Sequence, residues 1–322
     1  MSYADKAFKE ICNEIINYGV SDEGQDVRTV WEDTGEKAHT LKKFGIVKKY
    51  DLRKEFPAIT VRKTALKSAF KEILWIWQMK TSNLDALGLK IWDQWKDENN
   101  TIGRAYGYQI RESYLHHKIK CESEEDTTKK FYETEDLIRK ENYPSFYPAA
   151  SKEAKEVSCT MDQTDAILYD LKHNPYSRRI IGHMWNQKEL WAMQLMPCCW
   201  GIMLDVTPPK KGGKPVLNMT LIQRSSDVVV ANNWNVCQYA LLLMMFAQVS
   251  NMEAGELVHV MNNAHIYDRH IDIAKELVER EEHPAPSVHL NPAVKDFYKF
   301  TVDDLEIRNY ETGEQVKLPV AK

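Results

Sequence analysis

The chain lacks the spacings and charge balance of several common protein classes. Its six cysteines form no CxxC pair, so neither a zinc site nor a dithiol redox centre is expected, and no metal is predicted. It has no basic excess, because 43 Lys and Arg face 47 Asp and Glu, a formal net charge of −4. That balance argues against bulk attraction to nucleic acid. No apolar run approaches the roughly 20 residues that span a bilayer, so no membrane partner is expected.

The composition is that of an ordinary globular protein. Hydrophobic residues make up 43% of the 322 residues and charged residues 28%. The opening segment, MSYADKAFKEICNEI, is charged and amphipathic, unlike a signal peptide, so a cytoplasmic location is expected. No internal repeat is visible. We predict one domain, residues 1–322, with a charged insertion at about 116–160.

Helical and strand-like segments are mixed along the chain. They show no regular βαβ succession, which favours an α+β fold. Strands are predicted at 179–185, 199–206, 215–223, 256–262 and 299–308, with a hairpin turn at 210–214. Helices are predicted before Gly19 and at 64–80, 162–172, 236–250 and 265–280. The segment 236–250 is apolar nearly all round, which indicates a buried central helix.

The insertion at 116–160 differs in composition from the rest of the chain. It is charged, poor in aliphatic residues and punctuated by Pro144 and Pro148. We interpret it as a partly helical segment packed on the surface, with no part in chemistry.

Two adjacent cysteines, Cys198 and Cys199, are the most informative local feature. They follow Pro197 and stand between the doublet Arg178-Arg179 and the run Gln223-Arg224-Ser225-Ser226-Asp227. A thiol becomes a nucleophile when a positive group stabilises its thiolate, and arginine suits bidentate capture of phosphate. The combination suggests covalent catalysis on a phosphorylated substrate.

Each of these features also has a simpler structural explanation. Both cysteines can be small buried hydrophobic side chains, and the arginine doublet can form surface salt bridges. The run 223–227 can be a loop entrance, and Asn235 can be a helix cap. His265 and Tyr267 can be structural. Because neighbours in a strand point to opposite faces, at most one of the two cysteines can face a given cleft.

Taken together and in order, these motifs resemble the thymidylate synthase family. The resemblance covers nearly the whole chain except 116–160. The matching motifs are FPAITVRKTALKSAFKEILW, IWDQWKDENNTIGRAYGYQ, SRRI at 177–180, the Pro-Cys pair, QRSSD, WNVCQYALL, VHVMNNAHIYDRHI and PVA near the end. The resemblance implies a large mixed β-sheet with flanking helices, and two sheets packed back to back in a homodimer.

The resemblance also implies a reaction. Deoxyuridine monophosphate (dUMP) would be methylated to dTMP, with 5,10-methylenetetrahydrofolate as donor of methylene and hydride and dihydrofolate as product. Cys198 matches the nucleophile that adds to C6 of the pyrimidine. This addition is needed because C5 is a poor nucleophile until C6 has been attacked. Arg224 matches an arginine that contacts both phosphate and thiolate and would lower the cysteine pKa.

Further roles carry over residue by residue. Glu72 matches the carboxylate that organises water and protons around C4 and C5. Tyr106 matches a tyrosine near the C5 proton, and Asn235 matches the residue that selects uracil. The remaining substrate-binding matches are Arg28, Gln223, Ser225, Asp227, His265 and Tyr267, with Arg178 and Arg179 contributed by the other subunit. The folate-binding matches are Arg62, Trp92, Asp227 and Ala321.

The chain departs from the family pattern at a few positions. Cys199 stands where many members have histidine, Asn263 where aspartate is common, and Lys322 where an apolar residue is usual. The changes at Cys199, Trp200 and Lys322 keep open an alternative within the family, a dUMP hydroxymethylase in which water replaces hydride. A non-enzymatic relative that binds RNA or another partner is an alternative of a different class. The negative charge and the complete set of arginines weigh against it.

Overall fold

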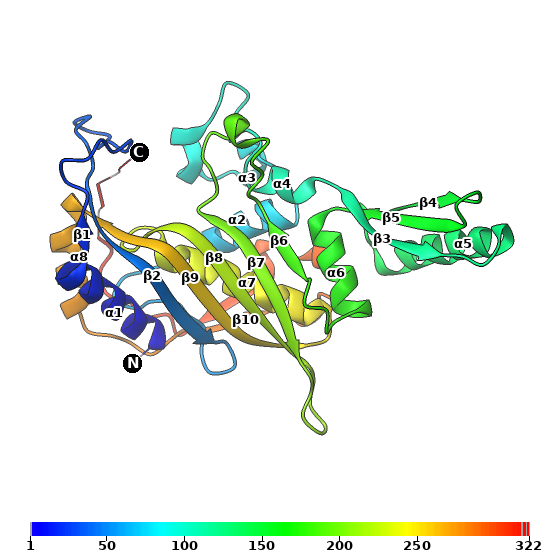
Figure 1. Cartoon of the computed structure of the whole chain (residues 1–322). Coiled ribbons are helices and arrows are strands. Elements are labelled where there is room, and N and C mark those ends of the chain that lie inside the picture. Colours follow the sequence, from blue (N-terminus) through cyan, green and yellow to red (C-terminus); the bar gives the residue numbers. More distant parts are fainter. Residues whose placement is uncertain (1, 317, 320, 322) are drawn as a thin grey trace.

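A mixed six-stranded sheet forms the centre of the molecule. The computed structural model describes residues 2–316, 318, 319 and 321. The sheet has the strand order β1-β2-β9-β8-β7-β6, and among the described strands only β8 and β9 run parallel (Figure 1). Its strands are β1 (Val20–Ser21), β2 (Thr40–Asp51), β6 (Ile181–His183), β7 (Cys199–Thr207), β8 (Val216–Asp227) and β9 (Glu253–Tyr267).

The buried helix α7 (Asn232–Val249) connects the two parallel strands. Its apolar side chains lie against the sheet and the helix α2, and large ones such as Tyr239 and Phe246 are at most 1% exposed. The prediction of a buried central helix is confirmed, although the helix begins four residues before 236. Ala231 is its N-cap. Asn235 is therefore a first-turn residue, and the interpretation of it as a cap is wrong.

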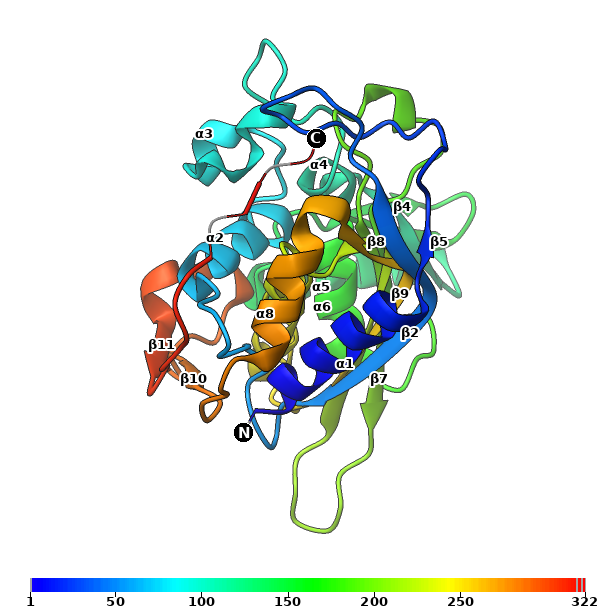
Figure 2. The same cartoon turned by 90° about the vertical axis from the view of Figure 1, so that its left-hand side faces the viewer.

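The other helices lie on the same side of the sheet as α7 (Figure 2). They are α1 (Tyr3–Tyr18), α2 (Leu66–Trp77), α3 (Leu84–Leu87), α4 (Gly107–Arg111), α6 (Gln163–His173) and α8 (Ile271–Glu279). Ser2 caps α1 and Asp162 caps α6. Each accepts a backbone N–H, and each stands just before a segment with helical spacing of apolar residues. The 3₁₀ turns are η1 (Lys90–Trp95), η2 (Leu190–Ala192), η3 (Asp268–His270), η4 (Phe297–Lys299) and η5 (Val302–Asp304).

The opposite face of the sheet carries no helix among the described residues (Figure 2). Apolar side chains on this face are exposed to solvent. Phe44 and Val47 reach this face together because Gly45, with φ of +73°, interrupts the alternation of β2. Lys43 and Lys48, on the two sides of Gly45, both pair with glutamates of α1 on the covered face. Phe44 is 81% exposed and Val47 55%.

The insertion forms a small module of its own that projects from the main sheet (Figure 1). A three-stranded antiparallel sheet of order β3-β5-β4 packs against one helix. The elements are β3 (Tyr114–Lys120), α5 (Glu124–Glu141), β4 (Tyr147–Ser151) and β5 (Glu156–Met161). The partly helical interpretation of 116–160 is therefore incomplete, because strands bound the helix and the module spans 114–161.

Several predicted boundaries differ from the structure. The predicted helix 265–280 begins only at Ile271, because β9 continues to Tyr267 and keeps 265–267 in the sheet. The predicted strand 299–308 shortens to β11 (Leu305–Arg308), which pairs with β10 (Ser287–Leu290). The strand β2 was not predicted. Its sequence, TLKKFGIVKKYD, holds four lysines and a glycine, which are uncommon in strands.

Candidate active site

The predicted site residues converge where β8 and β9 end. Because the two strands are parallel, their carboxyl ends reach the same edge, with Asp227 opposite His265 and Ser225 opposite Asn263. The antiparallel strand β7 begins at this edge, with Cys199 opposite Gln223. The topology alone therefore places Cys198, the run 223–227 and His265 in one neighbourhood.

Cys198 lies directly beside Arg224. The Arg224 Nη2 is 3.8 Å from the Cys198 Sγ, and the same guanidinium donates to the carbonyls of Met196 (2.7 Å) and Pro197 (3.0 Å). The backbone N–H of Arg224 also donates to the Cys198 carbonyl at 2.9 Å. These bonds fix the guanidinium next to the sulfur. Cys199 points into the core and is 3% exposed, whereas Cys198 is partly exposed.

Burial has the largest effect on the Cys198 thiol. It raises the pKa of Cys198 above its ordinary value, while Arg224, a hydrogen bond with Tyr106 and the charge of Arg28 act in the opposite direction. The expected effect of Arg224 on the thiol is therefore confirmed in direction, although the net shift of the Cys198 pKa is upward. Arg224 lowers the pKa, but desolvation outweighs it.

Tyr106 connects the nucleophile to the aromatic wall of the site. Its hydroxyl accepts the backbone N–H of Cys198 at 3.2 Å, and its ring packs edge-on against Trp92, 5.0 Å between centroids. Tyr106 has φ of +49°, a strained value for a residue with a side chain. Nearby, the backbone of Gly103 pairs with Met193, which holds the segment leading to Cys198 against this wall.

Glu72 is a buried carboxyl held between two indoles. Trp92 Nε1 donates to one oxygen at 2.8 Å, and Trp234 Nε1 donates to the other at 2.7 Å. Burial raises the pKa of Glu72 to about 7, even though the indole hydrogen bonds favour the ionised form. Glu72 can therefore give or take a proton near neutral pH.

A row of polar side chains runs beneath the site from His259 to Gln238. The Gln223 amide donates to the Asn235 Oδ1 at 3.1 Å and to the Ser225 carbonyl at 2.8 Å, and its oxygen lies 2.7 Å from the His259 Nε2. Burial lowers the pKa of His259 to about 3, so the imidazole is neutral and donates. Asn235 Nδ2 donates to the Gln238 Oε1 at 3.1 Å. Asn235 is thereby oriented and keeps one donor and one acceptor position for a ligand.

His265 and Tyr267 lie at the end of β9. His265 Nδ1 lies 3.0 Å from the Asn263 Oδ1, and its ring meets the Tyr267 ring edge-on at 5.2 Å. Tyr267 in turn packs against Trp31 at 5.7 Å. Arg28, on the exposed loop before Trp31, is close enough for its charge to act on both Tyr267 and Cys198.

Asp227 lies close enough to both Arg62 and Cys198 for its charge to act on each of them. Asp227 closes a turn by accepting the N–H groups of Val229 and Val230, each at 3.1 Å. Arg62 is 6% exposed and donates to the Val229 carbonyl, while its Nε has no hydrogen-bond partner within the described residues. A cavity of about 310 Å³ opens beside Arg62, with Trp234 and Leu318 in its wall.

The C-terminal segment closes against the same region. Ala321 pairs with Trp31 across an antiparallel bridge, and His270 Nε2 lies 2.9 Å from the Pro319 carbonyl. Lys322, which departs from the family pattern, lies outside the described residues.

Arg178 and Arg179 stand apart from the other site residues. Both are exposed, in the turn just before β6, and among the described residues neither guanidinium forms an ion pair. The structure therefore does not support the surface salt-bridge interpretation, and within one chain it does not bring the pair to Cys198.

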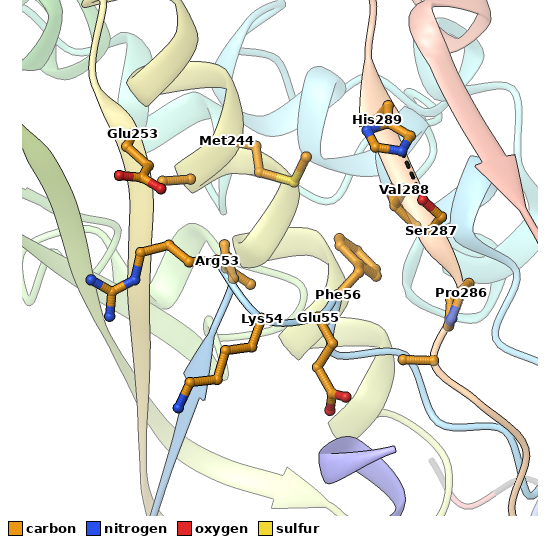
Figure 3. A pocket seen from close by; sticks show the side chains of 13 residues that line it. Arg53, Lys54, Glu55, Phe56, Met244, Glu253, Pro286, Ser287, Val288 and His289 are labelled. Carbon is orange, nitrogen blue, oxygen red and sulfur yellow. Dashed lines mark hydrogen bonds between the residues drawn. The ribbon is translucent and has the colours of Figure 1, made fainter. Parts of the chain in front are cut away.

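A larger cavity, about 480 Å³, is remote from these residues (Figure 3). It is lined by Arg53, Met244 and Glu253, and by a hydrogen-bonded pair, Ser287 and His289, 2.7 Å apart. Met244 lies nine residues after Asn235 on α7, about 14 Å along the helix axis. None of the predicted site residues lines this cavity.

Sequence reasoning missed three residues that shape the site: Trp234, His259 and Gln238. All three fall inside the motifs WNVCQYALL and VHVMNNAHIYDRHI. A polar residue in an otherwise apolar helix or strand was the available signal, because a buried polar group needs a partner.

The fold and the site define a transferase enzyme, in which a thiol, an arginine and a buried carboxyl meet at the end of a mixed sheet. The thymidylate synthase family model matches residues 6–322. Thymidylate synthase 1 of Bacillus subtilis (strain 168) is 39% identical over 100% of both chains, as is the enzyme of Bacillus phage phi3T. The solved structure of thermostable thymidylate synthase A from Bacillus subtilis superposes with a TM-score of 0.79 at 38% identity, covering 99% of each chain. The chain belongs to the thymidylate synthase family.

The described residues contain neither a metal-binding cluster nor a helix that could span a membrane. No group of three or more His, Cys, Asp or Glu side chains in that part of the chain is arranged to hold a metal ion. Of its helices, none combines the length and the apolar character needed to cross a membrane.

Proposed function

We propose that this protein converts dUMP to dTMP, using 5,10-methylenetetrahydrofolate and releasing dihydrofolate. The observation that carries the proposal is the meeting of Cys198, Arg224, Glu72 and Asn235 at one edge of the sheet, in a chain that matches thymidylate synthases over its full length. The folate supplies both the methylene group and the hydride.

Cys198 is proposed as the nucleophile. Its thiolate adds to C6 of the pyrimidine, and the electron density that this addition places on C5 makes C5 able to attack the methylene carbon. The pKa of the thiol is raised in the isolated chain. The positive charge of the two arginines of the partner subunit is proposed to help the thiol to ionise. Tyr106, whose hydroxyl accepts the Cys198 N–H, is proposed to lie near the C5 proton.

Asn235 is proposed to select the uracil ring. Held by Gln223 and Gln238, it retains one donor and one acceptor, which complement O4 and N3–H of uracil. Glu72, with its pKa near neutrality, is proposed to move protons at C4 and C5 through water.

Arg28, Arg224 and Ser225 are proposed to bind the phosphate, together with Arg178 and Arg179 of the partner subunit. His265 and Tyr267 are proposed to hold the 3′-hydroxyl of the sugar. A homodimer is supported by two features of the chain. The arginine pair is exposed without ion pairs in the described part, and the uncovered sheet face exposes Phe44, Val47 and other apolar side chains.

The folate is proposed to lie over Trp92 and Asp227, with its tail toward Arg62. The fit rests on Arg62 itself, a cationic side chain that borders a cavity of about 310 Å³. A carboxylate of the folate tail in this cavity would pair with the guanidinium. Ala321 is proposed to take part in closing the C-terminal segment over the folate. A reduced Cys198 thiol is required, which fits a cytoplasmic location.

The mass of the nucleotide product tests the proposal. The protein is incubated with dUMP and 5,10-methylenetetrahydrofolate, and the nucleotide is analysed by mass spectrometry while dihydrofolate is followed by absorbance. We expect dTMP and dihydrofolate in equal amounts. A hydroxymethylated nucleotide, or no product at saturating substrates, would contradict the proposal.

A further inference from the structure

We propose that Glu141, in the insertion, is a positioning residue for Arg178 and Arg179, and that it thereby sets how tightly the partner subunit's active site holds the phosphate of dUMP. The inference rests on the proposed function, since it takes these two arginines as phosphate ligands contributed across the dimer. It gives the insertion, which we expected to have no part in chemistry, a role in substrate binding.

Helix α6 connects the insertion to the arginine pair, and its N-terminal end is fixed without Glu141. Thr164 Oγ1 donates to the Trp77 carbonyl at 2.9 Å. The Gln163 side chain donates to the His183 carbonyl and accepts the His183 N–H, both at 2.7 Å. Asp165 accepts the Ser145 hydroxyl at 2.6 Å. The first turn of α6 is therefore tied to α2, to β6 and to the base of the insertion.

Glu141 holds the other end of α6. Its Oε2 accepts the Tyr143 hydroxyl at 2.7 Å and contacts the His173 Nε2 at 3.1 Å and the Lys172 Nζ at 3.4 Å. Lys172 and His173 are the last two residues of α6. Although burial opposes ionisation, the hydrogen bonds from Tyr143 and His173 hold the pKa of Glu141 below its ordinary value. The carboxylate is therefore charged and binds the Lys172 and His173 side chains at the helix end.

A short, hydrogen-bonded turn connects the end of α6 to Arg178 and Arg179. The N–H of Asn174 donates to the Asp170 carbonyl at 2.8 Å, that of Ser177 to the Asn174 carbonyl at 3.0 Å, and that of Arg179 to the Ser177 Oγ at 3.2 Å. After the pair, Ile180 is buried and joins the sheet through Leu204. The direction of the guanidinium groups thus depends on the sheet on one side and on the end of α6 on the other.

The remaining contacts between the insertion and α6 do not involve Glu141: His116 Nε2 lies 3.2 Å from the Asp170 Oδ1, and the others are mainly between aromatic rings. Tyr169 of α6 stacks on His117 at 5.1 Å and meets Phe146 edge-on at 5.7 Å. These rings do not need the carboxylate. Replacing Glu141 with glutamine therefore removes the charge at the end of α6 and leaves the shape of the module nearly unchanged.

The first experiment compares the variant Glu141→Gln with Glu133→Gln, on the exposed surface of the same helix, where Glu133 pairs with Lys129 one turn away. We expect Glu141→Gln to raise KM for dUMP about three- to ten-fold, with kcat and KM for the folate unchanged, a size usual for residues that act through another residue. Glu133→Gln should change none of these. A variant that only loses active protein would show a lower kcat at the same KM, and that outcome would overturn the inference.

A double-mutant cycle separates this inference from the proposed function. If Arg178→Ala with Arg179→Ala leaves KM for dUMP unchanged, the phosphate role proposed for the pair is wrong. If the arginine variant raises KM and Glu141→Gln adds nothing further in that background, Glu141 acts through the arginines. If Glu141→Gln instead adds its full factor, it acts independently of them and the inference is wrong.

Mixed dimers provide the directional test. In a dimer with one Cys198→Ser chain, a single site works, and the Cys198→Ser chain contributes the arginines to it. Glu141→Gln placed on that inactive chain should raise KM for dUMP, whereas on the chain with intact Cys198 it should leave KM unchanged. The reverse pattern would overturn the inference.

Discussion

At the scale of single residues, Cys198 is harder to ionise in the isolated chain than an ordinary thiol, even with a guanidinium 3.8 Å away. Burial protects the sulfur from oxidation and side reactions, but it disfavours the thiolate. Two further positive charges from the partner's arginines would shift that balance toward the thiolate. The nucleophile is therefore expected to be activated in the assembled, substrate-bound site.

The two adjacent cysteines should behave oppositely in a trapping experiment. With 5-fluoro-dUMP and the folate, Cys198→Ser should abolish the stable covalent complex. The reason is that a hydroxyl then replaces the partly exposed thiol beside Arg224. Cys199→Ser should still form it, because Cys199 is buried and faces the core. Intact-protein mass spectrometry measures both. A complex formed by Cys198→Ser would assign the attack to another residue.

Glu72 makes stability depend on pH in a defined direction. Its pKa is raised from 4.5 to about 7 in the folded chain, so its favourable protonated state is fully present below pH 4.5 and is lost as the pH rises through 7. The free energy of unfolding of the wild type, relative to Glu72→Gln, should therefore fall between pH 5 and pH 8. The fall should be at most about 3 kcal/mol. Urea unfolding at each pH measures it.

Removing one indole provides the matched control for Glu72. Trp234→Phe takes away a hydrogen bond that favours the ionised carboxylate, so the pH at which stability falls should move upward. A difference between wild type and Glu72→Gln that is constant from pH 5 to pH 8 would contradict a raised pKa.

The sequence allowed some site residues to be predicted and hid others. Cys198, Arg224 and Asn235 stand out because reactive or polar side chains interrupt apolar segments. The clamp on Glu72 could not be predicted, because Trp234 lies 162 residues away and only the fold brings it near. The net upward shift of the Cys198 pKa could not be predicted from the sequence either, because it depends on how deeply the sulfur is buried.

At the scale of elements, periodicity was a good guide where a segment buries one face or all of its surface, as in α1 and α7. It failed for β2, where Lys43 and Lys48 face α1 and pair with Glu14 and Glu10. It failed also in the insertion, whose strands are short and in which β5 buries every second residue, Val157, Cys159 and Met161. In both places tertiary contacts, rather than local propensity, decide the structure.

Gly103 ties the loop before Cys198 to the Tyr106 segment. It has φ of +67°, and a Cβ there would lie 2.2 Å from the Ala192 carbonyl oxygen. Gly103→Ala should lower the free energy of unfolding by about 3 kcal/mol, the upper end of the usual cost of a strained residue. It should also lower kcat, because Cys198 and Tyr106 would separate.

Gly213→Ala in the β7–β8 hairpin is the control, since its Cβ would meet nothing closer than 3.4 Å. Chemical unfolding and steady-state rates check both variants. Equal effects of the two substitutions would show that the close backbone approach at Gly103 is unimportant.

At the scale of the whole molecule, the uncovered sheet face and the exposed arginine pair point to the same assembly. Ile181 pairs with Met203 in the sheet, and these side chains are 45% and 42% exposed. Ile181 lies just after Arg178 and Arg179 on the same chain segment. A dimer through this face would cover the apolar side chains and bring the arginines to a second active site.

A charged side chain on this face should therefore weaken the dimer and lower the enzymatic activity. Met203→Glu should shift the protein toward monomer and lower activity at least about tenfold at dilute concentration, because an unpaired buried charge costs several kcal/mol. Tyr132→Glu on α5, at a position 60% exposed, should do neither. Sedimentation and activity assays across concentration measure the effect. A fully active monomer would contradict the shared site.

The parallel pairing of β8 and β9 also has a consequence for how the chain reaches its native state. The two strands cannot meet until α7 has crossed between them, and parallel pairings of this kind form more slowly than local hairpins. The amide groups of β8 and β9 should therefore gain protection from hydrogen exchange late during refolding, after those of α7. Because Arg224 and His265 lie on these strands, a chain that is only partly folded has no phosphate-binding edge to offer, and catalytic competence should emerge as one of the last steps of folding.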